Sequence, residues 1–307
     1  CAASWLSPAW AQSSWPTKPV RIIVPFAPGG TTDILARAVA PELSKAFGQS
    51  FIVENKAGAA GSIGMDYAAH QPNDGYAFVI GNLGPAGVNP LLQKLPYSME
   101  KDFISVSLSA TGPNILVVPA NSPYKTVKDV LSALRSSSAL SFGVSDSSAM
   151  LSGQLLNMLA RAEMPAISYK GAGPLMIDLA GGHVPLGIAA VSSVQGQVKG
   201  GRVRILGVGS ATPSSLFPLA PPIAQDLPGY EAISWFGLLA PKGTPAEVVQ
   251  KIHRDVAQVL KDPDVQQKIQ GLGADPGGLA PAEFQARIRR EIDLWGRVAK
   301  AAKIQPE

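Results

Sequence analysis

The sequence predicts an α/β protein built as two lobes with a cleft between them. Apolar runs that favour strands alternate with helix-like segments along most of the chain. Three early strands are each followed by a loop of small residues, which is typical of a parallel sheet whose functional edge lies at the carboxyl ends of its strands. The 307 residues are enough for two lobes and a sizeable core. Ligand pockets favour the interface between such lobes.

The stretch 20–33, VRIIVPFAPGGTTD, predicts the central loop of the functional site. Arg21–Val24 is dense in apolar, β-branched residues, as expected for a strand that is covered on both faces. Two prolines end the strand, and Gly29–Gly30 lets the chain turn without a steric penalty. Strand, glycine turn and helix start together predict an anion cradle.

The helix start supplies the chemistry of this cradle. Thr31 or Thr32 is expected to cap a helix that begins near Asp33. The first N–H groups of a helix are unpaired and carry the positive end of its dipole, so they favour a carboxylate or phosphate without Lys or Arg. The alternative is an ordinary turn between a strand and a helix, which this stretch alone does not exclude.

The next elements of the first lobe continue the alternation. They are a helix at Ile34–Phe47, a strand at Phe51–Glu54, a short helix at Met65–His70 and a strand at Tyr76–Ile80. Glycine-rich loops at 55–64 and 81–87 follow the second and third strands. The third loop contributes Asn82 and Gly84 to the predicted site.

The crossing into the second lobe is predicted near Gly112-Pro113, which separates strands at Phe103–Leu108 and Ile115–Val118. The second lobe repeats the alternation of strands and helices. Its predicted helices are Val127–Arg135, Met150–Arg161, Pro174–Leu179 and Ser193–Lys199, and its predicted strands are Leu140–Val144, Ala166–Ser168, Val184–Ala189 and Val203–Val208. The proline-rich segment Thr212–Pro228 is expected to be a surface connection.

Ala232–Leu239 predicts the strand that returns to the first lobe. Thr244-Pro245-Ala246-Glu247 matches a capping box with proline at the first helical position, and it opens a helix to about Leu260. Helices at Pro263–Leu272 and Pro281–Ala302 are expected to pack on the first lobe. We therefore predict that residues 12–110 and 235–307 form the first lobe and residues 111–234 the second.

Composition excludes some classes of function. Charged residues make up only 16% of the chain, below the ~25% of a typical domain, so binding must depend on backbone dipoles and hydroxyls more than on ion pairs. The net charge is +4, but the basic residues form no run with interleaved aromatics, so no nucleic-acid partner is expected. Cys1 is the only cysteine, which excludes an internal disulfide and zinc sites with paired cysteines.

The first residues predict export. Residues 1–11 end in Ala9-Trp10-Ala11 behind an apolar stretch, which is typical of the end of a secretory signal peptide. The alternative is that Cys1 is the lipidated terminus of a lipoprotein. No uninterrupted apolar run of about 20 residues could span a membrane.

No enzyme motif is complete in this sequence. A P-loop and the dinucleotide fingerprint are both absent, and the stretch 143–147, GVSDS, lacks the last glycine of a nucleophile elbow. His70, His183 and His253 form no motif with a carboxylate, so neither a metal nor another cofactor is expected. A triad assembled from distant positions is the alternative, which would make the chain an exported α/β serine hydrolase.

Three stretches of the second lobe offer hydroxyls at strand ends. They are Ser145–Ser148, Tyr169-Lys170-Gly171 and Ala190–Ser193. Hydroxyls and turn backbone at neighbouring strand ends can bind a small polar ligand. The serines can equally cap helices, and both interpretations stay open. For Tyr169 we favour ligand contact, because its ring can pack while its hydroxyl reaches the cleft.

An ordered set of motifs covers nearly all of 14–304. They are VPFAPGGTTDILAR (24–37), GQSFIVENKAGAAGSIG (48–64), PNDGYAF (72–78), Asn89-Pro90, Asp102-Phe103, SYKGAGPLMIDLAGGHV (168–184) and SWFGLLAPKGTP (234–245). With these motifs the sequence resembles the Bug family, the extracytoplasmic solute-binding receptors of tripartite tricarboxylate transporters. Many members have a His near Met150 and an acidic residue at Pro185, so the second lobe departs more from the family.

The resemblance implies a two-lobed Venus flytrap of the periplasmic-binding-protein type, similar to type II, without catalytic activity. It implies that a small carboxylate, such as a dicarboxylate, an amino acid or an aromatic acid, is held between the lobes and delivered to a membrane permease. The ligand carboxylate would meet the first loop, and Ser145, Ser147, Ser148 and Tyr169 would contact its distal end. Asp33 would organise the loop without touching the ligand.

The prediction is therefore a periplasmic, monomeric solute-binding receptor. Signalling to a membrane sensor instead of feeding transport is an alternative role that the sequence does not separate from the first. The predicted ligand-binding residues are Phe26, Ala27, Pro28, Gly29, Gly30, Thr31, Thr32, Asn82, Gly84, Ser145, Ser147, Ser148, Tyr169, Ala190 and Ser192.

Overall fold

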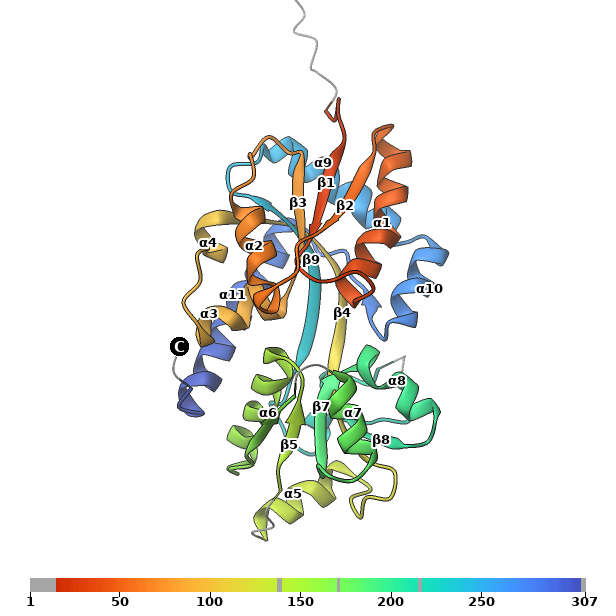
Figure 1. Ribbon diagram of the computed structural model, residues 1–307, viewed down its shortest axis with the longest axis vertical. Coiled ribbons are helices and arrows are strands. Elements are labelled where there is room, and N and C mark those ends of the chain that lie inside the picture. Colours follow the sequence, from red (N-terminus) through yellow and green to blue (C-terminus); the bar gives the residue numbers. More distant parts are fainter. Residues whose placement is uncertain (1–14, 137–139, 170–171, 215–216, 305–307) are drawn as a thin grey trace, which may run out of the picture.

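The chain folds into two lobes stacked along the long axis of the molecule and joined by two long strands (Figure 1). The computed structural model describes residues 15–136, 140–169, 172–214 and 217–304. Cys1 and the predicted signal segment 1–11 lie outside these ranges, so the export signal and the lipid anchor stay predictions. None of the helices in the described ranges is long and apolar enough to cross a membrane.

The first lobe is built on three parallel strands. They are β1 (Val20–Val24), β2 (Phe51–Asn55) and β3 (Ala77–Asn82), and β1 pairs in parallel with both of the others. Its helices are α1 (Thr31–Phe47), α2 (Ser62–Ala69), α3 (Asn89–Leu92), α4 (Met99–Asp102), α9 (Ala246–Val259) and α10 (Pro263–Gly271), with short turns η1 (Ala59–Gly61) and η2 (Gly84–Val88). The parallel pairing predicted for these strands is confirmed.

Successive side chains of β1 enter different parts of the core. Val20, Ile22 and Val24 pack with α1 and α9, whereas Ile23 packs with Met65 of α2. Both faces of the strand are therefore buried, which explains its continuous apolar sequence. Because the sheet is covered on both faces, the loops at its carboxyl edge are held by a rigid scaffold.

The second lobe repeats this architecture. Its strands are β5 (Phe142–Val144), β6 (Ala166–Ser168), β7 (Leu186–Ala190) and β8 (Val203–Val208), and its helices are α5 (Val127–Arg135), α6 (Ser147–Ala160), α7 (Ala172–Ala180) and α8 (Val191–Lys199), with the short turn η3 (Ile223–Gln225). β5 lies between β6 and β7 and is parallel to both. The predicted elements of this lobe are present, with ends shifted by a few residues.

Strand β4 (Phe103–Pro119) connects the two lobes. Its residues 103–113 pair antiparallel with β9 (Ile233–Pro241), and residues 114–119 pair with β7 and β8 of the second lobe. The prediction of two strands separated at Gly112-Pro113 is wrong, because the ladder with β9 continues through both residues. Irregularities in register, one of them between Leu108 and Ala110, interrupt the regular pairing, so one strand can serve both lobes.

The sheets are mixed because β9 is antiparallel to its neighbours β3 and β4, and β4 is antiparallel to β7 and β8. The order is β2-β1-β3-β9-β4-β7-β5-β6, with β8 and the short β10 (Asp275–Pro276) paired to β4 off this path. The predicted boundaries at 110/111 and 234/235 fall within β4 and near the start of β9. A division at those residues stays a prediction.

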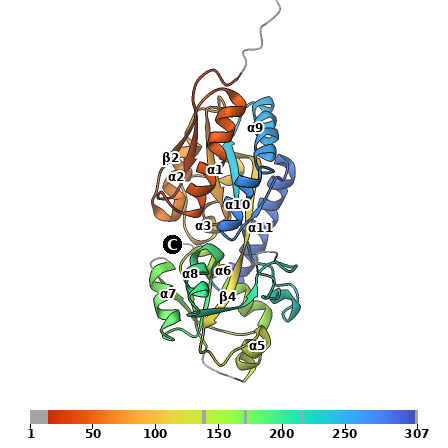
Figure 2. The same cartoon turned by 90° about the vertical axis from the view of Figure 1, so that its right-hand side faces the viewer.

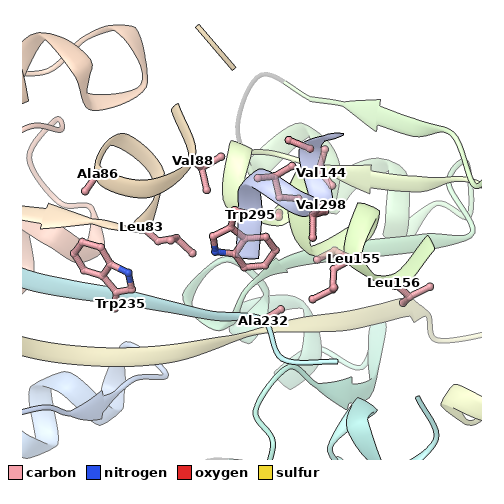
Figure 3. Close-up of a cluster of buried hydrophobic side chains, with 14 of the residues drawn as sticks. Leu83, Ala86, Val88, Val144, Leu155, Leu156, Ala232, Trp235, Trp295 and Val298 are labelled. Carbon is pink, nitrogen blue, oxygen red and sulfur yellow. The ribbon is translucent and has the colours of Figure 1, made fainter. Parts of the chain in front are cut away.

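Helix α11 (Pro281–Ala301) packs on both lobes (Figures 1 and 2). It lies against β4, as predicted for a helix that returns to the first lobe, and it also contacts α6 of the second lobe. Figure 3 shows its Trp295 and Val298 beside Val144 and Leu155. The two lobes therefore share one apolar cluster on this side of the molecule.

Two local predictions for the first lobe are wrong. The capping box at Thr244 does not form: Pro245 is the N-cap of α9, and the Thr244 hydroxyl donates to the carbonyl of Pro241 at 2.8 Å instead. The segment 81–87 is not a loop, since β3 extends to Asn82 and the helical turn η2 follows. Leu83, Ala86 and Val88 of this segment are buried, so tertiary packing stabilises the turn despite its two glycines.

Candidate ligand-binding cleft

A cavity of about 910 Å³ lies between the two lobes. Eleven of the predicted ligand-binding residues line it. They are Phe26, Gly30, Thr31, Thr32, Asn82, Gly84, Ser145, Ser147, Ser148, Ala190 and Ser192. These residues lie at or just after the ends of four strands, β1, β3, β5 and β7, so the fold brings together strand ends that are far apart in the sequence.

The first loop presents a helix start without a side-chain cap. Gly29 has a φ of +87°, Gly30 is the extended N-cap residue, and α1 begins at Thr31. The prediction that Thr31 or Thr32 caps a helix beginning near Asp33 is therefore wrong. The Thr31 hydroxyl instead donates to Ser192 Oγ of the other lobe at 3.3 Å. The N-terminus of α1 thus remains without a side-chain acceptor at the cavity wall.

Asp33 holds this loop from behind. It is 2% exposed, and its carboxylate accepts from the amide of Gly29 at 2.9 Å, from Asn55 Nδ2 at 2.9 Å and from Arg37 Nε at 2.9 Å. Desolvation alone would raise the pKa of Asp33, but the bonds from Arg37, Gly29 and Asn55 outweigh it and hold the pKa below the usual value. These contacts fit the predicted loop-organising role.

Neighbouring backbone fixes the position of Phe26. A Cβ at Gly61 would lie 2.9 Å from Phe26 Cζ, and Gly61 has a φ of +94°. Only glycine satisfies both requirements, so the second glycine-rich loop supports the first. Asn55 adds a hydrogen bond from Nδ2 to the carbonyl of Phe26 at 3.0 Å.

Four predicted residues do not line the cavity: Ala27, Pro28, Gly29 and Tyr169. The Gly29 amide is directed to Asp33. The Tyr169 hydroxyl donates to Asp178 Oδ2 at 2.9 Å, and its ring lies over Gly143, where a Cβ would be 3.1 Å from Cε2. Desolvation and the bond to Asp178 raise the pKa of Tyr169. Ligand contact by these four residues stays a prediction that the arrangement does not support.

The serine stretch after β5 forms the second wall. Asp146, not a serine, is the N-cap residue of α6, and its Oδ1 accepts from the amide of Ala149 at 2.9 Å. Ser147 Oγ donates across the cleft to Asn89 Oδ1 at 3.0 Å. Because Asp146 caps the helix, Ser145 and Ser147 are not needed for capping and remain candidates for ligand contact.

The position of the Asp146 carboxyl between the lobes shifts its pKa. Desolvation raises the pKa of Asp146, while hydrogen bonds from the amides of Ala149 and Ser148 and from Ser145 act in the opposite direction. The residue is nevertheless exposed, and it lines the cavity. Access to solvent favours the charged form of this carboxyl.

Two buried asparagines were missed by the sequence analysis. Asn89 donates to the carbonyl of Ala60 at 3.2 Å and to Ser62 Oγ at 3.3 Å, and Asn114 donates to Ser148 Oγ at 3.1 Å. Both line the cavity. An amide inside an otherwise apolar strand, as at Asn114, was the available signal, because a buried polar group requires partners.

The end of β3 and the start of α8 complete the lining. Asn82 Oδ1 is buried without a hydrogen-bond partner in the described part of the chain. Ala190 is the N-cap residue of α8 and offers no side-chain acceptor. The Asn82 oxygen can therefore accept a hydrogen bond from a guest in the cavity, and the N–H groups at the start of α8 can donate to one.

The electrostatics of the cleft depend on dipoles rather than cations. Among the described residues that line the cavity, none is Lys, Arg or His, and Asp146 alone carries a charge. In the described ranges, no group of three or more His, Cys, Asp or Glu side chains could hold a metal ion. The arrangement can bind a small anion through backbone N–H groups, hydroxyls and amides.

Comparison with known proteins gives consistent similarities. Residues 35–304 match the protein family described as "Tripartite tricarboxylate transporter family receptor". Protein BugT of Bordetella pertussis is 30% identical over 296 residues, which cover 94% of this chain and 91% of that protein.

Two solved structures are similar over nearly the whole chain. One is described as R. palustris Rpa4515 with adipate, with 39% identity, a TM-score of 0.82 and coverage of 95% of this chain and 100% of that one. The other is described as MatC (Rpa3494) from Rhodopseudomonas palustris with bound malate, with 30% identity, a TM-score of 0.78 and coverage of 92% and 99%.

Proposed function

Since the chain belongs to the family of tripartite tricarboxylate transporter receptors, we propose that it captures a small carboxylate in the periplasm and delivers it to a permease of that transporter class. The observation that carries the proposal is the cavity between the lobes, which combines the uncapped start of α1 with hydroxyls of both lobes. The relatives with adipate and malate support a carboxylate as the guest.

The free energy of binding requires several hydrogen-bond donors to act together. One helix N-terminus stabilises an anion by at most about 2 kcal/mol when it is partly buried. Micromolar affinity requires about 8 kcal/mol. Ser192, whose hydroxyl accepts from Thr31 and keeps its own proton, and the side-chain amide of Asn82 are placed to supply part of the difference.

We also propose that the protein is monomeric and that it is not an enzyme. Ser145 would be the nucleophile of the alternative serine hydrolase, but no His lies beside it in the described lining of the cavity. Ester or amide turnover that disappears in Ser145→Ala would favour the hydrolase. Dicarboxylates, amino acids and aromatic acids are all included as candidate ligand classes.

Calorimetric titration tests the proposal. The protein is first unfolded and refolded to remove any carried-over ligand, and is then titrated with succinate, malate, adipate, glutamate, hexanoate and benzoate. We expect at least one acid to bind, and Thr31→Val to weaken its binding about fivefold to tenfold, the equivalent of one hydrogen bond.

The matched control is Thr17→Val. The Thr17 hydroxyl lies 3.1 Å from Tyr76 Oη on the exposed surface of the first lobe, so its loss should leave affinity unchanged. Absence of heat with every acid, from protein that has refolded, would contradict the proposal.

A further inference from the structure

The two ends of the cleft differ in chemistry. One end is formed by the starts of α1 and α8, which are bonded to each other through Thr31 Oγ1 and Ser192 Oγ at 3.3 Å. Neither helix has a side-chain cap. Peptide dipoles of both lobes therefore point to this end, which suits a carboxylate.

The other end has apolar side chains and no cation among the described lining residues. Leu92 of α3, Met150 of α6 and Ile304 after α11 line it, and all three pack against the apolar cluster shared by the lobes. Gln93, which follows Leu92, and Gln154, one helical turn beyond Met150, also line the cavity, but both are uncharged. In Figure 1, α3, α6 and the end of α11 lie on the left, whereas α1 and α8 lie on the right. Helix α11 also contacts both α3 and α6. A ligand that spans the cleft thus meets apolar side chains and uncharged amides with its far end.

The third long helix that reaches the cavity does not offer a second anion site. Asp146 occupies the N-terminus of α6 by accepting the Ala149 amide at 2.9 Å. Its carboxylate neutralises the dipole of that helix and repels another anion nearby. In the described lining no Lys or Arg compensates for this charge.

From this asymmetry we infer that the ligand has a single carboxylate and an apolar body, such as an alkyl or aromatic monocarboxylic acid, and that short dicarboxylates are rejected. The inference rests on the proposed function and specifies its ligand class. The carboxylate lies at α1 and α8, and the body extends toward Met150. A cavity of about 910 Å³ has room for such a body.

Matched pairs of acids test this inference. Hexanoate is compared with adipate, and benzoate with terephthalate, by calorimetric titration of refolded protein at one ionic strength. We expect each monocarboxylate to bind at least about tenfold more tightly than its partner, because the second carboxylate would lose its hydration without gaining a cation. Equal or tighter binding of the diacids would overturn the inference while leaving the proposed function intact.

Failure of the proposed function gives a different result. No binding by any of the four acids or by the wider panel would contradict both proposals. Binding of a polar amino acid such as glutamate, with neither monocarboxylate bound, would overturn only the ligand class.

Two variants test the cause of the preference. Met150→Lys places a cation at the apolar end and should shift the ratio of hexanoate to adipate affinity about tenfold toward adipate. Asp146→Asn keeps an oxygen that can accept the Ala149 amide but removes the charge, so it should shift the ratio in the same direction by a smaller factor.

The control is Asp262→Asn. Asp262 is likewise an N-cap aspartate, at α10, where its Oδ1 accepts from Asp264 and Val265, and it does not line the cavity. The control should leave the ratio unchanged. An unchanged ratio in both Met150→Lys and Asp146→Asn, with unaltered circular dichroism, would overturn the inference.

Discussion

A single carboxylate determines the shape of the loop at the entrance of α1. The Asp33 carboxylate accepts hydrogen bonds from the backbone amide of Gly29, from Asn55 Nδ2 and from Arg37 Nε, and Asp33 does not itself line the cavity. The loop can therefore keep its helix start uncapped, since its other polar groups are satisfied from behind.

We expect Asp33→Asn to weaken ligand binding about tenfold and to lower the free energy of unfolding by about 1–3 kcal/mol, because bonds to a charged acceptor are lost. Titration and urea unfolding measure the two effects. Glu42→Gln on the same helix, where Glu42 pairs with Lys45 at 2.9 Å on the surface, is the control. Full affinity in Asp33→Asn would show that the loop keeps its shape without this charge.

Individual site residues were predictable where a local pattern decides them. The loop Gly30–Thr32 and the serines at 145–148 follow strands directly, and the structure brings them to one cavity. Asn89 and Asn114 were missed because their partners, Ser147 and Ser148, lie 58 and 34 residues away. Tyr169 was assigned to the ligand because the bond of its hydroxyl to Asp178 is not visible from local sequence.

Helix α11 and strand β9 are joined by a buried contact that includes a titratable carboxyl group. Glu291 Oε2 accepts from Trp235 Nε1 at 2.8 Å, and Oε1 accepts from Arg287 Nε at 2.8 Å. Burial raises the pKa of Glu291 to about 7, although Arg287 and Trp235 oppose the shift. The native state therefore holds a proton that the unfolded chain has already released at the same pH.

The sign of the resulting pH dependence follows from linkage. The contribution of Glu291 to stability is fully present below the pKa of the unfolded chain, near 4.5, and is lost as the pH rises through about 7. We expect Glu291→Gln to reduce the loss of unfolding free energy between pH 5 and pH 8 by up to about 3 kcal/mol.

Urea unfolding at both pH values measures this difference. Glu247→Gln, at an exposed position of α9, should behave like the unchanged protein. If Glu291→Gln shows the same pH dependence as the unchanged protein, Glu291 is not its source.

Most elements were predictable because their apolar periodicity is strong, as in α5, whose bounds Val127–Arg135 match the prediction. The errors arose where tertiary pairing overrides local signals. Gly112-Pro113 predicts a break, but the partner strand β9 continues the ladder through it. Pro245 takes the N-cap position because the Thr244 hydroxyl bonds to the carbonyl of Pro241.

The two-lobed fold and the Bug-type receptor family predicted from the sequence are confirmed. Hydrogen bonds between described residues cross the cleft at Thr31–Ser192, 3.3 Å, and at Ser147–Asn89, 3.0 Å. The apolar contact between α11 and α6 joins the lobes on a third side. The relative position of the lobes is thus set partly by bonds that need no ligand.

We expect the double variant Ser147→Ala, Ser192→Ala to populate an open arrangement. Each bond contributes about 0.5–1.5 kcal/mol, so removal of both shifts the equilibrium between open and closed forms about fivefold to a hundredfold. X-ray scattering of the ligand-free variant should show a larger radius of gyration. Ser136→Ala, at the far end of α5, is the control. An unchanged radius would mean that other contacts hold the lobes.

The position of Trp235 has a practical consequence. Its indole is sealed from water within β9, the strand that carries the chain between the lobes, and its neighbour Phe236 lines the cavity. A guest that presses on Phe236, or a rotation of the lobes about β9, changes the surroundings of this fluorophore. The protein thus contains its own optical reporter, and a shift in emission on adding an acid can follow occupancy without any attached dye.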